Sequence, residues 1–314
     1  MKIMKPLMTA LLAIALFFAP QLMGGSNVSY SLLVIIGIFA ILAYSLDLVV
    51  SDLGEVSLGH TVFFGTGAYT TAVASSQFGL GALETLMLAL AASTLVAAFV
   101  GLITLKLREF IFSLVTYSLA VISITLADNW MFVGGTDGIS GIPPLKFSIL
   151  GLDYLARTDQ QLWPVVYLGL LATLYLVHTF RRSRLGSEAM TVQLNTGLAI
   201  MSGINPMLVR MKVLVLSAPL AGLAGWLYAY QRAYISSDVF GAYFLLIMLT
   251  AVIMIGRRQL LCPLIGVALI ITQEKMFSLG AYWDNIILGT IIILVLCFFP
   301  GGLSRLFTRR VAHT

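Results

Sequence analysis

Charged residues are scarce in this chain of 314 residues, and their scarcity excludes a soluble globular protein. Only 10% of the residues are charged, whereas 60% are hydrophobic. A soluble domain of this length would carry about 25% charged residues. The apolar residues also form solid runs rather than the alternation that is typical of a membrane β-barrel. The composition therefore predicts an all-α, polytopic transmembrane helix bundle.

Residues that usually carry chemistry are equally scarce. Two cysteines, Cys262 and Cys297, suggest neither a disulfide framework nor a metal site. The three histidines are scattered, and no nucleophile lies beside a credible base. The chain has no Gly-x-x-x-x-Gly-Lys-Ser/Thr sequence, so it lacks the nucleotide-binding loop of P-loop proteins. We therefore predict that the chain is no enzyme, carries no cofactor or metal and binds no nucleic acid, and that its work is transport.

Apolar windows of about 20 residues match the thickness of a bilayer core. We expect about ten membrane segments, near 6–23, 30–50, 57–76, 84–105, 110–128, 163–180, 213–231, 239–256, 262–278 and 284–299. The first of these also resembles a signal peptide, whose cleavage would leave nine segments. We favour a retained helix.

The positive charges predict the orientation of the bundle. With both termini in the cytoplasm, 18 Lys and Arg residues divide unequally, because all but Lys146, Arg157, Arg232 and Lys275 fall inside. Cytoplasmic loops of membrane proteins carry such an excess. The net charge of +5 therefore reflects topology. We treat residues 1–314 as a single transmembrane domain.

A polar segment, residues 181–212, lies between two apolar stretches on the predicted cytoplasmic side. It is too long for a tight turn and too short for a domain. Apolar residues recur in it at helical spacing, which places them on one face of a short amphipathic helix: Met190, Leu194, Leu198 and Met201. The helix ends at a break, Gly203-Ile204-Asn205-Pro206. Such a helix is well shaped to be held by a cytoplasmic partner.

One long external segment, residues 128–162, separates the fifth and sixth predicted spans. Its density of glycine and proline favours turns over helix. The segment contains Gly134, Gly135, Thr136, Asp137 and Gly138. We expect a loop that folds back over the mouth of a pathway, or a plain connector.

The segment from 51 to 70 is the best candidate for the translocation pathway. Its glycines permit a broken or irregular helix, which a membrane tolerates only where protein or a water-filled cavity satisfies the backbone. Backbone groups freed in this way can bind a polar solute. The candidate pathway residues are Ser57, Gly59, His60, Phe63, Phe64, Gly67 and Tyr69. The alternative is that the glycines pack helices together and that His60 bonds to a neighbouring span.

Two acidic residues, Asp47 and Asp128, fall near the ends of predicted spans. A carboxylate buried in the membrane would mark a functional site, because burying charge in lipid is costly. We expect both side chains to reach the interface instead. Small residues between Ala218 and Gly225 form a face for close helix packing.

Several motifs in one order resemble the membrane permeases of ABC importers for branched-chain amino acids and related solutes, urea among them. The resemblance covers nearly the whole chain after the first span, and within that family it fits the longer of the two permease types. It rests on the following sequences: Ser57-Leu58-Gly59-His60, Phe63-Phe64-Gly65, Gly67-Ala68-Tyr69, Gly134-Gly135-Thr136-Asp137-Gly138-Ile139, Ser183-Arg184-Leu185-Gly186, Gly203-Ile204-Asn205-Pro206, Leu220 to Gly225 and Phe299-Pro300-Gly301-Gly302-Leu303.

The resemblance implies an assembly in a bacterial or archaeal cytoplasmic membrane. Its members are a heterodimer of two permeases, two cytoplasmic ATPases that bind the ATP, and a periplasmic or extracellular solute-binding protein. It assigns segment 181–212 to coupling with the ATPase, through Gly186, Glu188, Met190, Leu194, Leu198, Met201, Gly203, Asn205 and Pro206. The chain departs from the family in two places: residues 192–201 carry no charge, and Ile255-Gly256-Arg257-Arg258 replaces a Gly-Gly-x-Gly-Thr sequence.

The sequence therefore predicts the permease subunit of an ABC importer for a small polar solute, with branched-chain or related amino acids as the first choice. Urea, amides and carboxylic or aromatic acids stay open as solutes. The alternative is an ion-coupled secondary transporter or channel, in which Asp47, His60 or Asp128 would handle protons or ions. A degenerate paralogue with a structural or regulatory role is a third reading.

Overall fold

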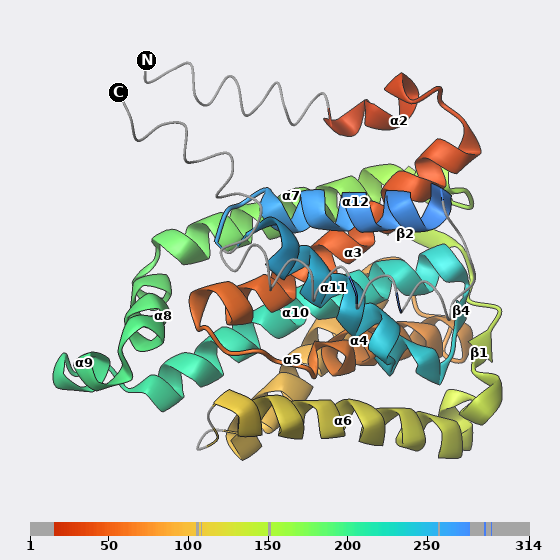
Figure 1. Ribbon diagram of the computed structural model, residues 1–314. Helices are drawn as coiled ribbons and strands as arrows, with labels where there is room; N and C mark the ends of the chain where they lie inside the picture. The colour runs from red at the N-terminus through yellow and green to blue at the C-terminus, as the bar shows by residue number, and fades with distance from the viewer. Residues whose placement is uncertain are drawn as a thin grey trace, which may run out of the picture.

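A computed structural model of the chain describes residues 16–104, 107, 109–149, 152–256, 258–276, 286 and 290. Within them the chain is predominantly helical (Figure 1). The helices are α2 (Ala19–Leu22), α3 (Asn27–Asp52), α4 (His60–Ser76), α5 (Ala82–Thr104), α6 (Glu109–Asn129), α7 (Asp159–Arg182), α8 (Arg184–Leu194), α9 (Thr196–Met201), α10 (Pro206–Arg232), α11 (Ala242–Ile255) and α12 (Cys262–Met276). Three 3₁₀ turns are η1 (Met131–Val133), η2 (Gly135–Asp137) and η3 (Ser237–Phe240).

Four short strands interrupt the helical pattern. They are β1 (Ile139–Ser140), β2 (Leu145–Ile149), β3 (Leu152–Ala156) and β4 (Tyr234–Ile235). β2 and β3 form an antiparallel hairpin, and β1 pairs with β4. In Figure 1 β1 and β4 lie at one end of the bundle, and α8 and α9 lie at the other. The external segment predicted to consist of turns therefore contains a hairpin as well.

Six helices in the described residues are long and apolar enough to cross a membrane. They are Asn27–Asp52, Ala82–Thr104, Phe110–Asn129, Asp159–Arg182, Pro206–Arg232 and Ser237–Met254. Each matches a predicted span. The predicted spans at 57–76 and 262–278 correspond to the shorter helices α4 and α12. The predicted spans at 6–23 and 284–299 lie largely outside the described residues.

Helix α3 forms the centre of the bundle, since it is buried along nearly all of its length from Val34 to Asp52. It packs against α7, α10, α11 and α12. By contrast, α5 and α6 leave much of their apolar surface exposed, as expected of helices that face lipid or another membrane subunit.

Glycines allow α4 and α10 to pack closely against each other. The small residues between Ala218 and Gly225 predicted such a packing face on α10. A Cβ atom on Gly67 would lie 2.5 Å from the carbonyl oxygen of Gly222, and one on Gly225 would meet the carbonyl oxygen of Phe64. Only glycine allows the two backbones to approach so closely.

Candidate translocation and coupling sites

The chain between α3 and α4 is not helical, although it is largely buried. Helix α3 ends at Asp52, and Gly54 then adopts a left-handed conformation with φ +76°. Side chains of α6 satisfy backbone groups of this linker: Thr116 Oγ1 accepts from the Leu58 N–H at 3.1 Å, and Ser113 Oγ donates to the Val56 carbonyl at 2.6 Å. The chain is therefore irregular at residues 53–59, where protein groups replace the lost helical bonds, whereas α4 continues without a break through Gly65 and Gly67.

His60 joins this linker to α10. It begins α4 and is fully buried. Its Nδ1 lies 2.9 Å from Ser57 Oγ, and its Nε2 lies 3.2 Å from Ser217 Oγ. Both ring nitrogens therefore have protein partners, and the ring edge packs against Phe63. His60 holds Ser57 and α10 together at the start of α4.

The other candidate pathway residues divide between packing positions and a cavity. Phe63 and Phe64 are buried in the core, and Phe64 packs against Tyr228 and Phe244. Gly59 lies against the Thr116 backbone, and Gly67 lies at the α10 contact. Tyr69 alone among the seven lines the cavity described next.

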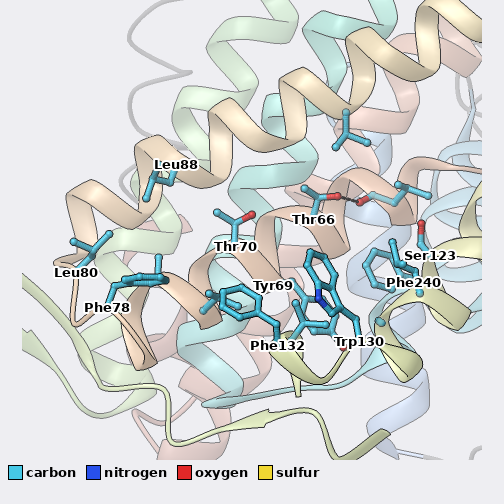
Figure 2. A pocket seen from close by; sticks show the side chains of 17 residues that line it. Thr66, Tyr69, Thr70, Phe78, Leu80, Leu88, Ser123, Trp130, Phe132 and Phe240 are labelled. Atoms are coloured by element: carbon cyan, nitrogen blue, oxygen red, sulfur yellow. Dashed lines mark hydrogen bonds between the residues drawn. The ribbon is translucent and has the colours of Figure 1, made fainter. Parts of the chain in front are cut away.

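A cavity of about 690 Å³ lies between α4, α5 and α6. Figure 2 shows the rings of Tyr69, Trp130 and Phe132 grouped at one side, with Leu80 and Leu88 at the other. The lining side chains are apolar or hydroxyl-bearing and none carries a charge: Val62, Thr66, Tyr69, Thr70, Val73, Ala74, Phe78, Leu80, Leu88, Val96, Ser123, Leu126, Ala127, Trp130, Phe132, Val133 and Phe240. The sequence did not predict the residues from α5 and α6, because only the folded bundle brings them together.

The external segment contributes to this cavity through Trp130, Phe132 and Val133. Three of its glycines, Gly134, Gly135 and Gly138, adopt positive φ angles, which other residues rarely tolerate. A Cβ atom on Gly134 would collide with the Gly138 carbonyl. The glycines thus fold the chain back on itself.

Three contacts hold the folded segment in place. Ile139 pairs with Ile235 in the β1–β4 ladder, and the Tyr234 hydroxyl donates to the Asp137 carbonyl at 3.1 Å. The Gln77 amide donates to the Phe132 carbonyl at 3.0 Å. Asp137 and Thr136 are exposed on the segment's outer surface. The segment lies along one side of the cavity and is tied to both α4 and the α10–α11 connection.

Segment 181–212 forms two short helices rather than the single amphipathic helix that the sequence predicted. Asn195 is extended, ends α8, and caps α9 by accepting from the Leu198 N–H at 3.0 Å. An asparagine side chain competes for backbone donors in this way and starts a new helix. The predicted apolar stripe is divided as a result, and Met190 turns inward to the Arg258 guanidinium.

The residues on either side of this break form an exposed apolar tip, which we define as Leu194, Leu198, Ile200 and Met201. All four side chains are exposed, and Met201 is 88% exposed. The tip ends at Gly203, whose φ is +77°, and Asn205 caps α10 with Pro206 in its first turn. Glu188 bonds to Arg184 on the surface of α8 at 2.9 Å, and Gly186 lies against the end of α7 where a side chain would meet the Phe180 carbonyl.

Buried charges lie beside these helices, and here the sequence prediction for Asp47 was wrong. Its side chain is 1% exposed and does not reach an interface. Arg181 lies 2.5 Å from Asp47 and 3.1 Å from Asp52. The two partners are 134 residues apart in sequence, so no local pattern could predict the pair. Asp128, in contrast, is partly exposed at the end of α6.

Two further ion pairs extend this charge cluster. Arg258 lies 3.0 Å from Asp52, and Arg210 lies 2.6 Å from Glu55. The acids belong to the end of α3 and the linker, whereas the arginines belong to three other elements. We define the charge cluster as these six residues: Asp47, Asp52, Glu55, Arg181, Arg210 and Arg258. In the part of the chain that the structure describes, no three His, Cys, Asp or Glu side chains are placed to hold a metal ion.

Replacement of His60 by alanine tests its packing role. The change removes the partner of the buried Ser57 hydroxyl, which costs about 1–3 kcal/mol. We expect a lower melting temperature in detergent, with the solute preference of uptake unchanged. A changed solute preference at unchanged stability would instead make His60 a contact of the solute.

Comparisons with known proteins identify relatives along most of the chain. A family model described as branched-chain amino acid transport system / permease component matches residues 28–296. Two relatives carry the name high-affinity branched-chain amino acid transport system permease protein LivM. The protein from Salmonella typhimurium strain LT2 is 27% identical, and that from Escherichia coli strain K12 is 26% identical, each over 289 residues. The alignment covers 85% of this chain and 67% of either relative. No solved structure matches the chain.

Proposed function

Because the chain belongs to the permease family of branched-chain amino acid transport systems, we propose that it forms the translocation pathway of an importer for branched-chain or related amino acids. The predicted resemblance to this family is confirmed. The chain is a multi-span membrane permease of a bacterial ABC importer and not a catalytic subunit. The ATP is bound by separate subunits.

The apolar tip is the observation that supports coupling to an ATPase. It presents four large apolar side chains at the end of the bundle where Arg181, Arg182 and Arg184 gather. Exposed apolar clusters of this kind mark surfaces that contact a partner or a membrane, and the excess of positive charge favours the cytoplasmic side for this one, where an ATPase would bind. In our proposal Gly186, Glu188, Met190, Gly203, Asn205 and Pro206 shape the α8–α9 unit that carries this tip.

The topology that we propose has ten membrane segments and both termini in the cytoplasm. Residues 1–314 then form one transmembrane domain, with 181–212 as its cytoplasmic coupling segment and 128–162 as its external loop. The positive-inside distribution supports this orientation. The position of α8 and α9 opposite β1 and β4 agrees with it (Figure 1).

We expect the complete transporter to contain a second permease subunit, two ATP-binding subunits and a solute-binding protein outside the membrane. The exposed apolar faces of α5 and α6 leave room for a permease partner as well as for lipid. The apolar part of the cavity lining beside these helices suits the apolar side chain of a branched-chain amino acid, and the hydroxyl groups of Thr66, Thr70 and Ser123 are among its polar groups.

The described residues give little support to an ion-coupled carrier that uses Asp47 or His60. Asp47 is paired with Arg181, and His60 bonds to two serines, so neither side chain is positioned to exchange ions with a pathway. Proteoliposome uptake provides the test. An importer requires the ATPase subunits and ATP, whereas a carrier would respond to a proton or sodium gradient alone.

Replacement of Gly203 by valine tests the docking role of the α8–α9 unit. Gly203 has a positive φ and open space around it, so a β-branched residue strains the backbone by about 1–2 kcal/mol without a collision. We expect the variant to insert into the membrane normally, but less ATPase should co-purify with it in a detergent pull-down.

The matched control is Gly79→Val. Gly79 also has a positive φ, of +62°, and no atoms near its Cβ position, but it lies at the end of α4 away from α8 and α9. The control should retain the ATPase. Normal ATPase recovery and transport in Gly203→Val would remove this support for the docking role.

A further inference from the structure

Two arginines flank the α8–α9 unit in sequence. Arg181 lies in the last turn of α7, just before α8 begins at Arg184. Arg210 lies in the first turns of α10, just after Gly203, Ile204 and Asn205. Both side chains point away from solvent, with exposed fractions of 11% and 16%. The two guanidinium groups therefore lie on the helix ends to which the α8–α9 unit is joined.

The acids that pair with these arginines lie at the end of α3 and in the linker that follows it. Asp47 and Asp52 belong to the last turns of α3, and Glu55 belongs to the linker. A third contact joins the same parts without charge: a Cβ atom on Gly54 would lie 2.8 Å from the Gln193 Cγ atom of α8. Both ends and one face of the α8–α9 unit are thus connected to one short stretch of chain.

The connected stretch leads directly into α4. After Glu55 come Ser57 and then His60, which binds Ser57 and also Ser217 of α10. Helix α4 then supplies Thr66, Tyr69 and Thr70 to the uncharged cavity. The ion pairs, the short backbone stretch from Glu55 to His60 and helix α4 itself therefore connect the α8–α9 unit to the cavity.

We infer that the charge cluster is the mechanical link through which movement of the α8–α9 unit reaches α4, with Arg181 and Arg210 as positioning residues for transport. The buried environment suits this role. Val49, Leu53, Phe112 and Leu214 lie around Glu55 and Arg210, so water does not compete strongly for the pair. Two charges held 2.6 Å apart among apolar side chains attract each other more strongly than exposed charges do, so a displacement of one partner acts on the other. The inference rests on the proposed function, because it assumes an ATPase that moves α8 and α9.

The test uses the double variant Glu55→Gln with Arg210→Gln in the full transporter, reconstituted with its ATPase, second permease and binding protein. The double change removes the ion pair without leaving a buried charge alone. We expect normal subunit recovery and continued ATP hydrolysis, but about tenfold less solute moved per ATP. A purely structural role would not change this ratio, because unfolded complexes lose uptake and hydrolysis together.

Lys212→Gln is the control for the loss of positive charge, since Lys212 is exposed on the same helix and belongs to no part of the cluster. Its ratio of transport to hydrolysis should equal that of the wild type. The exchange Glu55→Arg with Arg210→Glu reverses the pair and should restore at least half of the lost ratio.

The outcomes separate the inference from the proposed function. A wild-type ratio in the Gln/Gln variant overturns the inference, and so does failure of both double variants to assemble. The exchange variant decides the matter if only the Gln/Gln variant fails to assemble. A ratio of transport to hydrolysis near that of the wild type in the exchange variant then supports the inference, and a ratio about tenfold lower overturns it. Uptake by the wild-type complex without ATP would instead contradict the proposed function.

Discussion

Replacement of Arg181 by methionine should destabilise the protein by about 3–5 kcal/mol, the largest effect that we expect from a single change. The substitution leaves Asp47 buried with Ser51 as its remaining partner, whereas Asp52 keeps Arg258. Methionine fills much of the volume but supplies no charge. The effect is measured by thermal unfolding in detergent, which is monitored through tryptophan fluorescence or through the loss of monodisperse protein.

Two further variants make this prediction specific. Arg182→Met changes the neighbouring residue, which is exposed, and should leave the melting temperature nearly unchanged. Asp47→Asn combined with Arg181→Met removes the uncompensated charge and keeps an acceptor for Ser51. This double variant should therefore regain most of the stability that Arg181→Met alone loses. Equal effects from Arg181→Met and Arg182→Met would show that the buried pair contributes nothing.

Replacement of Gly67 by alanine should destabilise the bundle by about 3 kcal/mol, the upper part of the usual range for overpacking. The added methyl group would lie 2.5 Å from the Gly222 carbonyl oxygen, and a backbone atom cannot rotate away as a side chain can. The α4–α10 contact must therefore open. The same thermal measurement detects the change, with chain recovery from membranes as a second readout.

Gly101→Ala provides the matched control. Gly101 is also a buried helical glycine, but a Cβ atom there would lie 3.4 Å from Met211 Cγ, an ordinary contact distance. Alanine should be neutral or slightly stabilising at this position, because it favours helix more than glycine does. If Gly67→Ala were as stable as Gly101→Ala, the close crossing of α4 and α10 would be wrong.

Much of the bundle could be predicted because its causes are local. Apolar runs of membrane length give α3, α5, α6, α7 and α10, and the small residues of α10 mark its contact with α4. The helix break at Gly203-Ile204-Asn205-Pro206 could also be predicted from the sequence. A left-handed glycine, an asparagine cap and a proline in the first turn each act within a few residues.

The rest depends on contacts between distant parts of the chain. Asp47 lies near the end of an apolar run, so the sequence suggested an interfacial carboxylate, and only the fold shows that Arg181 meets it there. The helix break at Asn195 was missed because the apolar spacing of Met190, Leu194 and Leu198 continues across it. In the structure the asparagine cap outweighs that spacing. The cavity combines residues of α4, α5 and α6 whose spacing in sequence carries no sign of a shared site.

The most direct test of the account is a mild-detergent pull-down of the tagged chain from its native membrane, followed by uptake measurements on the recovered material in proteoliposomes. We expect a second permease and P-loop ATPases to be recovered with the chain, and solute uptake to require ATP. Recovery of the chain alone, with solute uptake driven without ATP by an ion gradient or by the solute gradient itself, would contradict it.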